Sequence, residues 1–509
     1  MRAKVPHNAS FIISYALALA ALALTTLVLS CAADGGKLSL EAESDLLPRL
    51  EAMIADHPLP ARWSIAVSGE KPSVAIILNA EPPGSSLPRG AYQCGTRYLA
   101  ASADLADNLF SVSARRAEEL GLSKLESIVL PRRALAVDGI WPGKAGYPFA
   151  QRLALYARSA QSAESSGKTP RLPTAISRWL AEAAKAAAAS DPSPTDLAAA
   201  GDIQVGECQW PLLSGSEAGL VSLLRGGVLD LLRKPDIAVA NLEAPISARG
   251  FPNPRKRYRF RMPPGSAAAL EKAGLDLLLF GNNHGLDFGG DAFDDTLVDL
   301  EKAGLPMVGA GRDISEAARA RILGTGPGRI AFVGYAFFPN ETLGFTTAEA
   351  AAGPHRAGVS ADEAASMEAV RRAAASGATV VVLAHGGTEY VESPSLAARK
   401  LYARFIDAGA ALVAGTHPHL LQGCEARSGS LIAYSLGNFL FTGEAEPPAA
   451  WKSAILDFLV YRGKVRGLAI HPIIAAYDYT TVDPDLTAAE ARFAGLCAGL
   501  EGRMARGSK

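Results

Sequence analysis

The chain has 509 residues, more than one typical domain, so its length predicts two or three domains. Its composition is that of a globular protein, with 49% hydrophobic and 20% charged residues. The formal net charge is −1, so no overall charge draws the chain to a nucleic acid or to an acidic polymer. We therefore expect no nucleic-acid partner, and any attraction to an anionic ligand must be local.

The first 31 residues have the pattern of a bacterial export signal. Arg2 and Lys4 precede an apolar run from Phe11 to Leu29 and a group of small residues. The tetrapeptide that ends at Cys31 is similar to a lipobox, in which the cysteine is acylated and becomes the new N-terminus. We interpret residues 1–31 as a lipoprotein signal peptide, with an uncleaved anchor helix or an ordinary cleaved signal as the alternatives. Each interpretation places the body of the chain outside the cytoplasm, and a lipid anchor would hold it at the membrane.

The next part of the chain predicts a tether and a small domain. Residues 32–44 begin as a small, polar stretch that favours a tether. Residues 45–173 mix strand-like runs with helical periods and are predicted to form an accessory α/β domain. Residues 136–149 resemble a segment of periplasmic solute-binding proteins, and the alternative is a domain that binds no ligand. An alanine-rich helix and a proline-containing breaker then predict a helix and linker over residues 174–195.

From residue 196 to about 480, apolar strand-like runs alternate with helical stretches. This alternation is typical of an α/β fold with a mainly parallel, covered sheet. Residues 481–509 are predicted as a C-terminal helix and tail. The predicted strands include 237–240, 275–280, 379–384 and 411–414, and the predicted helices include 266–273, 291–303, 361–376 and 395–408.

Polar residues follow directly after five of the predicted strands. Ligands of open α/β sheets bind outside the carboxyl ends of the strands, so these side chains should converge in one crevice. Four of the eight histidines of the chain belong to this set. Its members are Asp202, Asn241, Glu243, Asn282, Asn283, His284, Asp287, His385, Glu389, Tyr390, His417 and His419.

The residue types in this set fit a divalent metal. Carboxylates, an amide oxygen and imidazoles together suit manganese, zinc or iron, and we expect one or two such ions. A carboxylate that bridges two cations lets the pair hold a phosphate and activate water. Taken singly, a strand-end aspartate is more often a helix cap and a buried histidine more often a core residue. Their clustering favours a joint site.

The order of the motifs resembles the CapA family of capsule-synthesis proteins. The resemblance implies a metallophosphatase-like (calcineurin-like) four-layer αββα sandwich over residues 196–480. It also links the chain to the synthesis or export of poly-γ-glutamate, with capsule synthesis or export proteins as partners. The segments that carry the resemblance are 201–202, 241–245, 281–289, 308–311, 385–390, 415–419 and 434–439.

The resemblance implies a role for each residue of the crevice. Asp202 and Glu243 would be carboxylate ligands, with Glu243 as the bridge. His284 would face the substrate as a general acid or charge stabiliser, and Asp287 would orient its ring. Asn283, His385 and His417 would complete one metal site and His419 the other. Asn241, Asn282, Glu389, Tyr390, Ser435 and Asn438 would line the crevice.

Two residues depart from the family pattern. Metallophosphatases usually begin with Asp-X-His, and here Gln204 occupies the third position. The first metal therefore lacks one imidazole ligand. We still count Gln204 among the residues of the metal site. The family usually carries a tryptophan after the motif histidine, and here it is Gly386. The basic run 255–261 also has two interpretations: Arg259 and Arg261 bind an acidic substrate, or the run is a solvated edge strand.

The sequence leaves two functions open. The first is a metal-dependent, phosphoesterase-like hydrolase or transferase that acts on a phosphoester or on an amide of an anionic polymer at the cell surface. The second is a non-catalytic assembly or polymer-binding factor for the capsule. His284 with Asp287, and the His417–His419 step, favour the first, whereas Gln204 favours the second.

Overall fold

The computed structural model describes residues 192–213, 217–444 and 446–507, together with separate segments between residues 36 and 190. The predicted signal peptide, with its lipobox at Cys31, lies outside the described residues. Within these ranges no helix is both long and apolar enough to cross a bilayer. The chain divides into two compact units, the first made of residues 1–98 and 148–191 and the second of residues 99–147 and 192–509.

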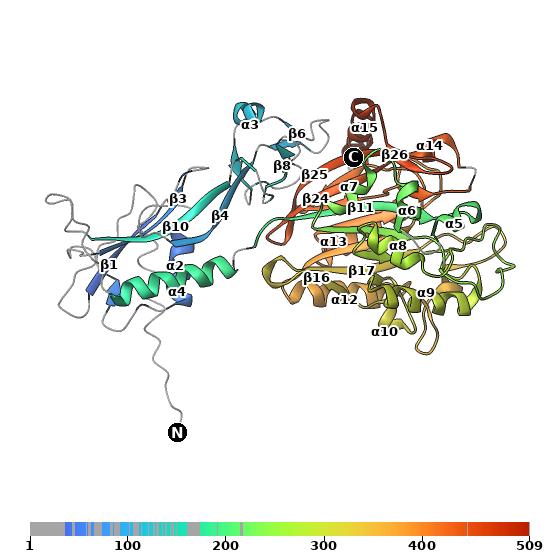
Figure 1. Cartoon of the computed structure of the whole chain (residues 1–509), viewed down its shortest axis with the longest axis horizontal. Helices are drawn as coiled ribbons and strands as arrows, with labels where there is room; N and C mark the ends of the chain where they lie inside the picture. Colours follow the sequence, from blue (N-terminus) through green and yellow to red (C-terminus); the bar gives the residue numbers. More distant parts are fainter. Residues whose placement is uncertain are drawn as a thin grey trace, which may run out of the picture. The chain divides into compact units, whose positions relative to one another are not determined.

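The first unit is a small α/β domain in which two helices pack against a sheet (Figure 1). Leu50 from one helix and Leu180 from the other are fully buried against Leu78 and Leu155 of the sheet. The helices are α2 (Leu47–Asp56) and α4 (Thr174–Ser190). The described strands run in the order β2 (Trp63–Ile65), β1 (Gly36–Ala42), β3 (Val74–Glu81), β10 (Ala150–Ser159) and β4 (Tyr92–Ala100).

The limits of the units differ from those expected from composition. Residues 36–42, expected within a tether, form strand β1, because Leu40 is buried in the core of the first unit. Residues 99–147 belong to the second unit, where Ala134 pairs with Gly467. The ring of Trp141 fills the space beside Gly467, since an added Cβ there would lie 2.8 Å from it. Such pairing across more than three hundred residues leaves no local sequence pattern, and the accessory role of residues 45–173 stays a prediction.

The larger sheet of the second unit carries the first half of the candidate site. Its strands β11 to β14 are parallel, and β24 and β25 continue the sheet in antiparallel fashion. The described order is β14 (Met307–Val308), β13 (Leu277–Leu279), β12 (Ile237–Leu242), β11 (Thr195–Gln204), β24 (Lys452–Tyr461), β25 (Lys464–Ala475), β8 (Arg132–Ala134) and β5 (Ser102–Asp104), with β23 (Asn438–Phe441) beside β11 and β26 (Thr480–Val482) beside β25.

The smaller sheet of the second unit carries the other half of the candidate site. Strands β17, β19, β20 and β22 are parallel, and short antiparallel strands close both edges. The described order is β16 (Arg321–Leu323), β17 (Ile330–Phe337), β19 (Thr379–Gly386), β20 (Leu412–Thr416), β22 (Ser430–Ala433) and β21 (Cys424–Arg427). Strands β17 and β19 read as continuous apolar runs because both of their faces are covered.

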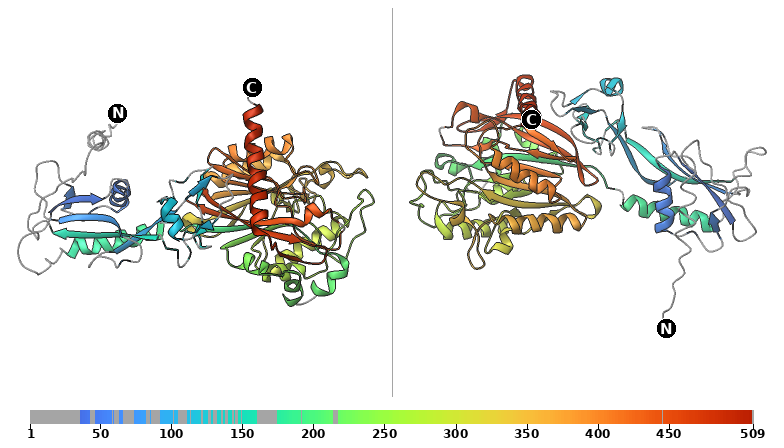
Figure 2. Two further views of the ribbon diagram at one scale, coloured as in Figure 1. Left: turned by 90° about the horizontal axis from the view of Figure 1, so that it is seen from above. Right: turned by 180° about the vertical axis from the view of Figure 1, so that it is seen from behind.

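The two sheets face each other between two layers of helices. Leu197 and Val239 of the larger sheet share one buried cluster with Val381 and Leu412 of the smaller sheet. A second cluster joins the outer face of the larger sheet to α8 (Ser266–Lys272) and α9 (Gly289–Ala303), and a third joins the outer face of the smaller sheet to α12 (Glu363–Ala375) and α13 (Leu396–Asp407) (Figure 2). This confirms the predicted four-layer αββα sandwich.

Further helices and strands complete the described part of the second unit. Helix α9 ends at Gly304, whose φ of 68° is the left-handed conformation that closes a helix most easily in glycine. The remaining elements are α3 (Ala114–Leu120), α5 (Trp210–Leu213), α6 (Glu217–Leu223), α7 (Val228–Arg233), α10 (Ile314–Ala317), α11 (Thr347–Ala350), α14 (Pro448–Trp451), α15 (Leu486–Gly507), β6 (Ser111–Val112), β7 (Ser123–Lys124), β9 (Ala136–Val137), β15 (Ala310–Gly311) and β18 (Gly358–Val359).

Candidate metal centre

The carboxyl ends of parallel strands from both sheets meet at one edge of the sandwich. Asp202 on β11 is the register partner of Asn241 on β12, and His385 on β19 is the partner of Thr416 on β20. The structure brings together ten side chains of the predicted set, each at most 5% exposed: Asp202, Asn241, Glu243, Asn282, Asn283, His284, Asp287, His385, His417 and His419.

A close backbone approach fixes the position of Asp202. Its N–H donates to the carbonyl of Gly437 at 3.0 Å. A Cβ added to Gly201, the preceding residue, would lie 1.8 Å from that same carbonyl oxygen, so only glycine permits the approach. The register of β11 also shifts between Ala199 and Asp202, an irregularity of the kind that re-aims side chains at the rim of a sheet.

Two groups of potential ligand atoms share Glu243. One consists of Glu243, His385 and His417, and the other of Asp202, Glu243 and His419; in each group the ligand atoms lie within 4.8 Å of one another. The Oε1 atom of Glu243 lies 3.5 Å from Nε2 of His385 and 3.9 Å from Nε2 of His419. These buried groups could hold a metal ion, and the shared carboxylate occupies the position that a bridging ligand requires.

The loop after β20 carries two histidines in uncommon backbone conformations. His417 has a φ of 94° and His419 a φ of 56°, both in the region that non-glycine residues rarely adopt. This arrangement brings His417 Nδ1 within 3.1 Å of His385 Nε2 and His419 Nδ1 within 3.4 Å of an oxygen of Asp202. Backbone strain of this type is characteristic of functional sites, where the surrounding structure holds it.

The electrostatics of the cluster call for a positive charge. Burial raises the pKa of Asp202, and burial together with the neighbouring Asp202 raises the pKa of Glu243 well above its ordinary value. Burial also lowers the pKa values of His385 and His417 well below the ordinary value, so both rings are neutral. Neutral imidazoles are the form that ligates a metal.

Two buried atoms without a hydrogen-bond partner among the described residues indicate whether a metal ion fits the site. Oε1 of Glu243 and Nε2 of His417 are buried and have no hydrogen-bond partner among the described residues. Such atoms are costly unless something satisfies them, and both belong to the same group of ligand atoms. A divalent cation bound by oxygen and imidazole nitrogen would satisfy both, so the residues present fit the group.

Neighbouring amides and a hydroxyl hold the ligands. Asn241 donates through Nδ2 to Asp202 at 2.8 Å, and Asn282 donates in turn to the side-chain oxygen of Asn241 at 3.1 Å. The ring of His385 lies 3.0 Å from the hydroxyl of Thr416. The Nδ1 atom of His419 lies 2.8 Å from the amide oxygen of Asn438. Such partners orient metal ligands and raise their basicity.

His284 lies beside the ligand cluster and outside both groups. Its Nδ1 is 2.7 Å from an Asp287 oxygen, and its ring contacts that of Phe260 in a tilted arrangement, with centroids 4.2 Å apart. Burial raises the pKa of Asp287 to about 7, an effect that the ammonium of Lys256 opposes from 2.8 Å. The predicted pairing of His284 with Asp287 is therefore present in the structure.

The other predicted residues lie around this centre. Gln204 is buried and donates from Nε2 to the carbonyl of Thr442 at 2.6 Å. An added Cβ at Gly386 would lie 2.4 Å from the carbonyl of Phe337, so this backbone leaves no room for the tryptophan usual in the family. Ser435 is buried and accepts a hydrogen bond from the N–H of Gly437.

The rim of the site is part acidic and part basic. Glu389 is 45% exposed in its side chain, with Oε1 3.9 Å from Nε2 of His417, and the ring of Tyr390 stacks on His419. Arg259 is exposed, and the guanidinium of Arg261 lies over the Phe288 ring at 4.1 Å. The basic run 255–261 is a loop with turns, so the edge-strand interpretation is wrong: after β12 the chain leaves the sheet.

Sequence reasoning missed two charged residues of the site. Lys256 is fully buried, although the basic run around it indicates a solvated segment, and Glu341 lies after β17, where no motif marks it. A lysine flanked by arginines gives no local signal of burial. The position of Glu341 beside Asn283 depends on the packing of the two sheets against each other.

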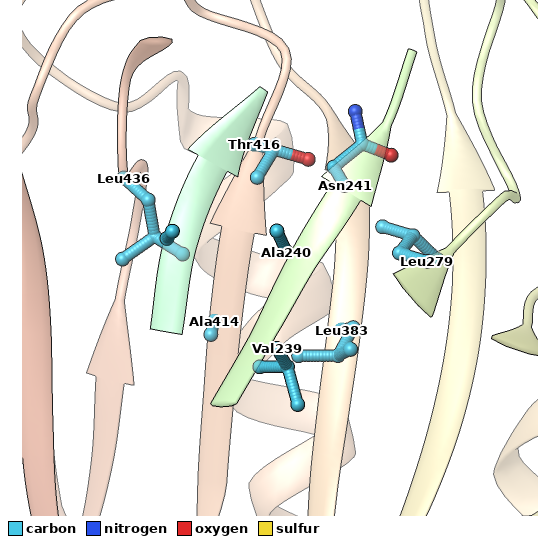
Figure 3. A pocket seen from close by; sticks show the side chains of 9 residues that line it. Val239, Ala240, Asn241, Leu279, Leu383, Ala414, Thr416 and Leu436 are labelled. Carbon is cyan, nitrogen blue, oxygen red and sulfur yellow. The ribbon is translucent and has the colours of Figure 1, made fainter. Parts of the chain in front are cut away.

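A small cavity lies between the sheets directly below the ligands. Asn241 and Thr416 stand at its polar end (Figure 3). The remaining lining is apolar, and low polarity strengthens electrostatic interactions above it. The apolar lining consists of Ala200, Val239, Ala240, Leu279, Leu383, Ala414 and Leu436.

An αββα sandwich with carboxylates, histidines and an asparagine at the strand ends of both sheets defines a metallophosphatase-like protein. Residues 196–443 match the sequence model of the family described as bacterial capsule synthesis protein PGA_cap. This domain of the chain therefore belongs to the CapA-like capsule-synthesis family.

Three relatives illustrate the similarity. The PGA biosynthesis protein CapA of Bacillus subtilis is 31% identical over 216 residues, which cover 42% of this chain and 54% of the relative. The capsule biosynthesis protein CapA of Bacillus anthracis is 27% identical, with 41% and 51% covered. A probable polyglutamine synthesis accessory protein of Mycobacterium tuberculosis is 30% identical, with 40% and 55% covered. The chain thus spans about half the length of these relatives.

Two solved structures resemble the chain at low TM-scores. A hypothetical protein from Thermus thermophilus gives a TM-score of 0.33 at 18% identity, over 57% of this chain and 100% of that protein. The sulfate thiohydrolase SoxB of the same organism, in complex with glycerol, gives a TM-score of 0.32 at 16% identity, over 58% and 59%.

Proposed function

We propose that this protein is an accessory factor in the synthesis or export of an anionic capsule polymer of the poly-γ-glutamate type. The family match and the names of the two Bacillus relatives support this proposal. The partners would be the polymer and the proteins that make or export it. The first compact unit lies outside the family match, and its contribution would be specific to chains of this architecture.

The sandwich domain would carry a divalent-metal hydrolase-type site that acts on the polymer or on a phosphoester. The observation that carries this proposal is the shared, buried and unsatisfied carboxylate oxygen of Glu243 between two groups of ligand atoms. Asp202, Glu243, Asn283, His385, His417 and His419 would hold one or two ions of manganese, zinc or iron. A divalent cation supplies Lewis acidity toward a phosphoryl or carbonyl oxygen.

The protein's own residues would orient the substrate and move a proton. Asp287, with an oxygen 2.7 Å from Nδ1 of His284, would accept a hydrogen bond from that nitrogen, which would leave Nε2 of the ring to donate to or accept from the reacting group. Arg259 and Arg261 would attract an anionic chain. Glu389 and Tyr390 would border the entrance beside His417 and His419.

A non-catalytic assembly factor is the second candidate, and two residues favour it. Gln204 stands where metallophosphatases have a histidine, and its amide is occupied with the carbonyl of Thr442. Gly386 replaces a tryptophan that would form one wall of the crevice. In this alternative, the domain binds metal or polymer and catalyses no reaction.

Metal analysis and a turnover screen on one preparation separate these candidates. Purified protein would be loaded with Mn²⁺, Zn²⁺ or Fe²⁺, and its metal content compared with that of an Asp202→Asn/His385→Ala variant. Activity would be measured on aryl phosphoesters and on γ-glutamyl oligomers. We expect metal in the wild type and metal-dependent turnover of one substrate. Metal binding without turnover, with capsule production intact in a His284→Ala strain, would favour the assembly factor.

We also propose that the mature protein is a lipoprotein exported to the periplasmic or cell-surface face of the membrane. The proposal rests on the signal pattern that ends at Cys31. Cys31→Ser should leave the precursor unprocessed or release the protein from the membrane, whereas Cys94→Ser should not. Membrane association that persists in the Cys31→Ser protein with an intact N-terminus would indicate an anchor helix.

A further inference from the structure

Lys256 is a fully buried cation within a run of mostly exposed arginines. Its ammonium nitrogen lies 2.8 Å from Oδ1 of Asp287, 2.8 Å from Oε1 of Glu341 and 2.5 Å from the carbonyl oxygen of Asn283. An ammonium is costly to bury unless partners of this kind surround it. The burial of Lys256 among exposed neighbours therefore requires its own explanation.

One arm of this network reaches a candidate metal ligand. The side-chain amide of Asn283 donates from Nδ2 to Oε1 of Glu341 at 3.3 Å, and this is the same oxygen that pairs with Lys256. With its nitrogen committed to Glu341, the amide points its oxygen toward the ligand cluster. That oxygen lies 2.8 Å from Nε2 of His385. The pair of Lys256 and Glu341 thus selects one of the two possible amide orientations.

The other arm reaches the candidate proton donor. One oxygen of Asp287 pairs with Lys256, and the other accepts from the backbone N–H of Phe260 and lies 2.7 Å from Nδ1 of His284. The Nδ1 atom is closer to Asp287 than to the ammonium, which lies 3.5 Å away. The carboxylate of Asp287 therefore keeps the proton of the ring on Nδ1, and Nε2 faces away from Asp287.

We infer that Lys256 is a positioning residue that sets the amide orientation of Asn283 and the tautomer of His284 together. The inference rests on the proposed metal site and extends it. It assigns to one buried ammonium the alignment of a ligand from one side and of the proton donor from the other. If Lys256 served only stability, its loss would weaken the fold and leave both alignments unchanged in the protein that remains folded.

The test uses the full chain and two measurements that need no turnover. Calorimetric titration with Mn²⁺ reports the ligand arm, and the ¹⁵N chemical shifts of the His284 ring in the metal-free protein report the tautomer arm. The variants are Lys256→Met, Lys256→Arg and Glu341→Ala. Arg257→Met is the matched control, since that neighbouring cation is exposed. The double variant Lys256→Met/Glu341→Ala keeps the buried charges balanced and leaves Asp287 in place if the single variant does not fold.

The two arms predict different patterns. Lys256→Met, or the double variant in its place, should weaken Mn²⁺ affinity about tenfold or more and mix the two tautomers of His284. Lys256→Arg should recover only part of both, because a planar guanidinium cannot reproduce the compact ammonium. Glu341→Ala should weaken Mn²⁺ binding and leave the tautomer unchanged, and Arg257→Met should change neither.

A folded Lys256 variant with wild-type Mn²⁺ affinity and an undisturbed His284 tautomer would overturn the inference. If the wild type binds Mn²⁺ but turns over no substrate, the proposed enzyme fails and the positioning role stands. If the wild type binds no Mn²⁺, Zn²⁺ or Fe²⁺, the proposed metal site fails and the ligand arm fails with it. The tautomer measurement then decides the remaining arm.

Discussion

Oε1 of Glu243 and Nε2 of His385 lie 3.5 Å apart, although their strands belong to different sheets of the sandwich. Glu243 follows β12 of the larger sheet, and His385 lies on β19 of the smaller sheet. Only the packing of one sheet against the other makes them neighbours. The contact joins a carboxyl group with a strongly raised pKa to an imidazole with a strongly lowered one, so both groups gain if a cation binds between them.

Glu243→Gln should reduce metal binding and stabilise the metal-free protein. The substitution removes the shared ligand, and it also removes a buried carboxyl group beside Asp202 that is costly to ionise. We expect Mn²⁺ affinity to fall at least tenfold. The free energy of unfolding in EDTA at pH 8 should rise by about 1 kcal/mol or more. Glu271→Gln on the exposed surface of α8 is the control and should change neither. Undiminished Mn²⁺ binding in Glu243→Gln would argue against a bridging role.

His284→Ala should retain metal and lose turnover. His284 belongs to neither group of ligand atoms, so metal content by mass spectrometry should match the wild type. Loss of a general acid should lower kcat roughly a hundredfold or more on the best phosphoester or γ-glutamyl substrate. His355→Ala is the matched control, because that histidine is exposed. Wild-type kcat in His284→Ala would remove this residue from the chemistry.

Gln204→His should strengthen metal binding on the Asp202 side of the centre. An imidazole can donate from one ring nitrogen to the carbonyl of Thr442, as the glutamine does now, and offer the other nitrogen as a ligand. We expect the number of ions bound per chain, or the affinity for the weaker ion, to increase in calorimetric titration. Gln422→His, at another buried glutamine, is the control. Equal titrations for Gln204→His and the wild type would show that this position does not limit occupancy.

Asp196→Asn should make stability less dependent on pH. Burial, and then the neighbouring Asp457, raise the pKa of Asp196 to about 7, with Lys144 and His471 opposing and Asp236 adding to the rise. The folded protein thus holds a proton that the unfolded chain has released, and its stability falls as pH rises from about 4 to 7.

Asparagine carries no charge at any of these pH values, so the variant does not lose this stability as the pH rises. Its free energy of unfolding at pH 8, in EDTA, should exceed that of the wild type by about 1–3 kcal/mol, and the difference should shrink at pH 4. Denaturant unfolding at the two pH values measures it. Asp478→Asn, at an exposed aspartate, is the control. A difference that does not change with pH would contradict the assignment.

The sequence predicted the elements of the sandwich well because each carries its own periodicity. Helix α9 covers the predicted residues 291–303, and β19 begins at the predicted Thr379. Strand ends shifted by one or two residues, as at β20, which runs to Thr416 rather than Ala414. The convergence of the polar residues was also predictable, since strand ends in a parallel sheet share one edge.

What could not be predicted depends on contacts between distant segments. The burial of Lys256 follows from Asp287 and Glu341, which lie in loops after strands of different sheets. The pairing of Ala134 with Gly467, which draws residues 99–147 into the second unit, is equally invisible in local pattern. Gly386 looked like the loss of a crevice wall, whereas the structure explains it by close packing on Phe337.

The most direct test of the metal centre is a crystal structure of the full chain grown with Mn²⁺, with data collected at the manganese absorption edge. An anomalous peak should lie within about 2.0–2.3 Å of Oε1 of Glu243 and of a ring nitrogen of His385 or His417. In Glu243→Gln crystals the peak should weaken strongly or disappear. A wild-type map with no peak at these atoms, or with its strongest peak at other side chains, would contradict the account.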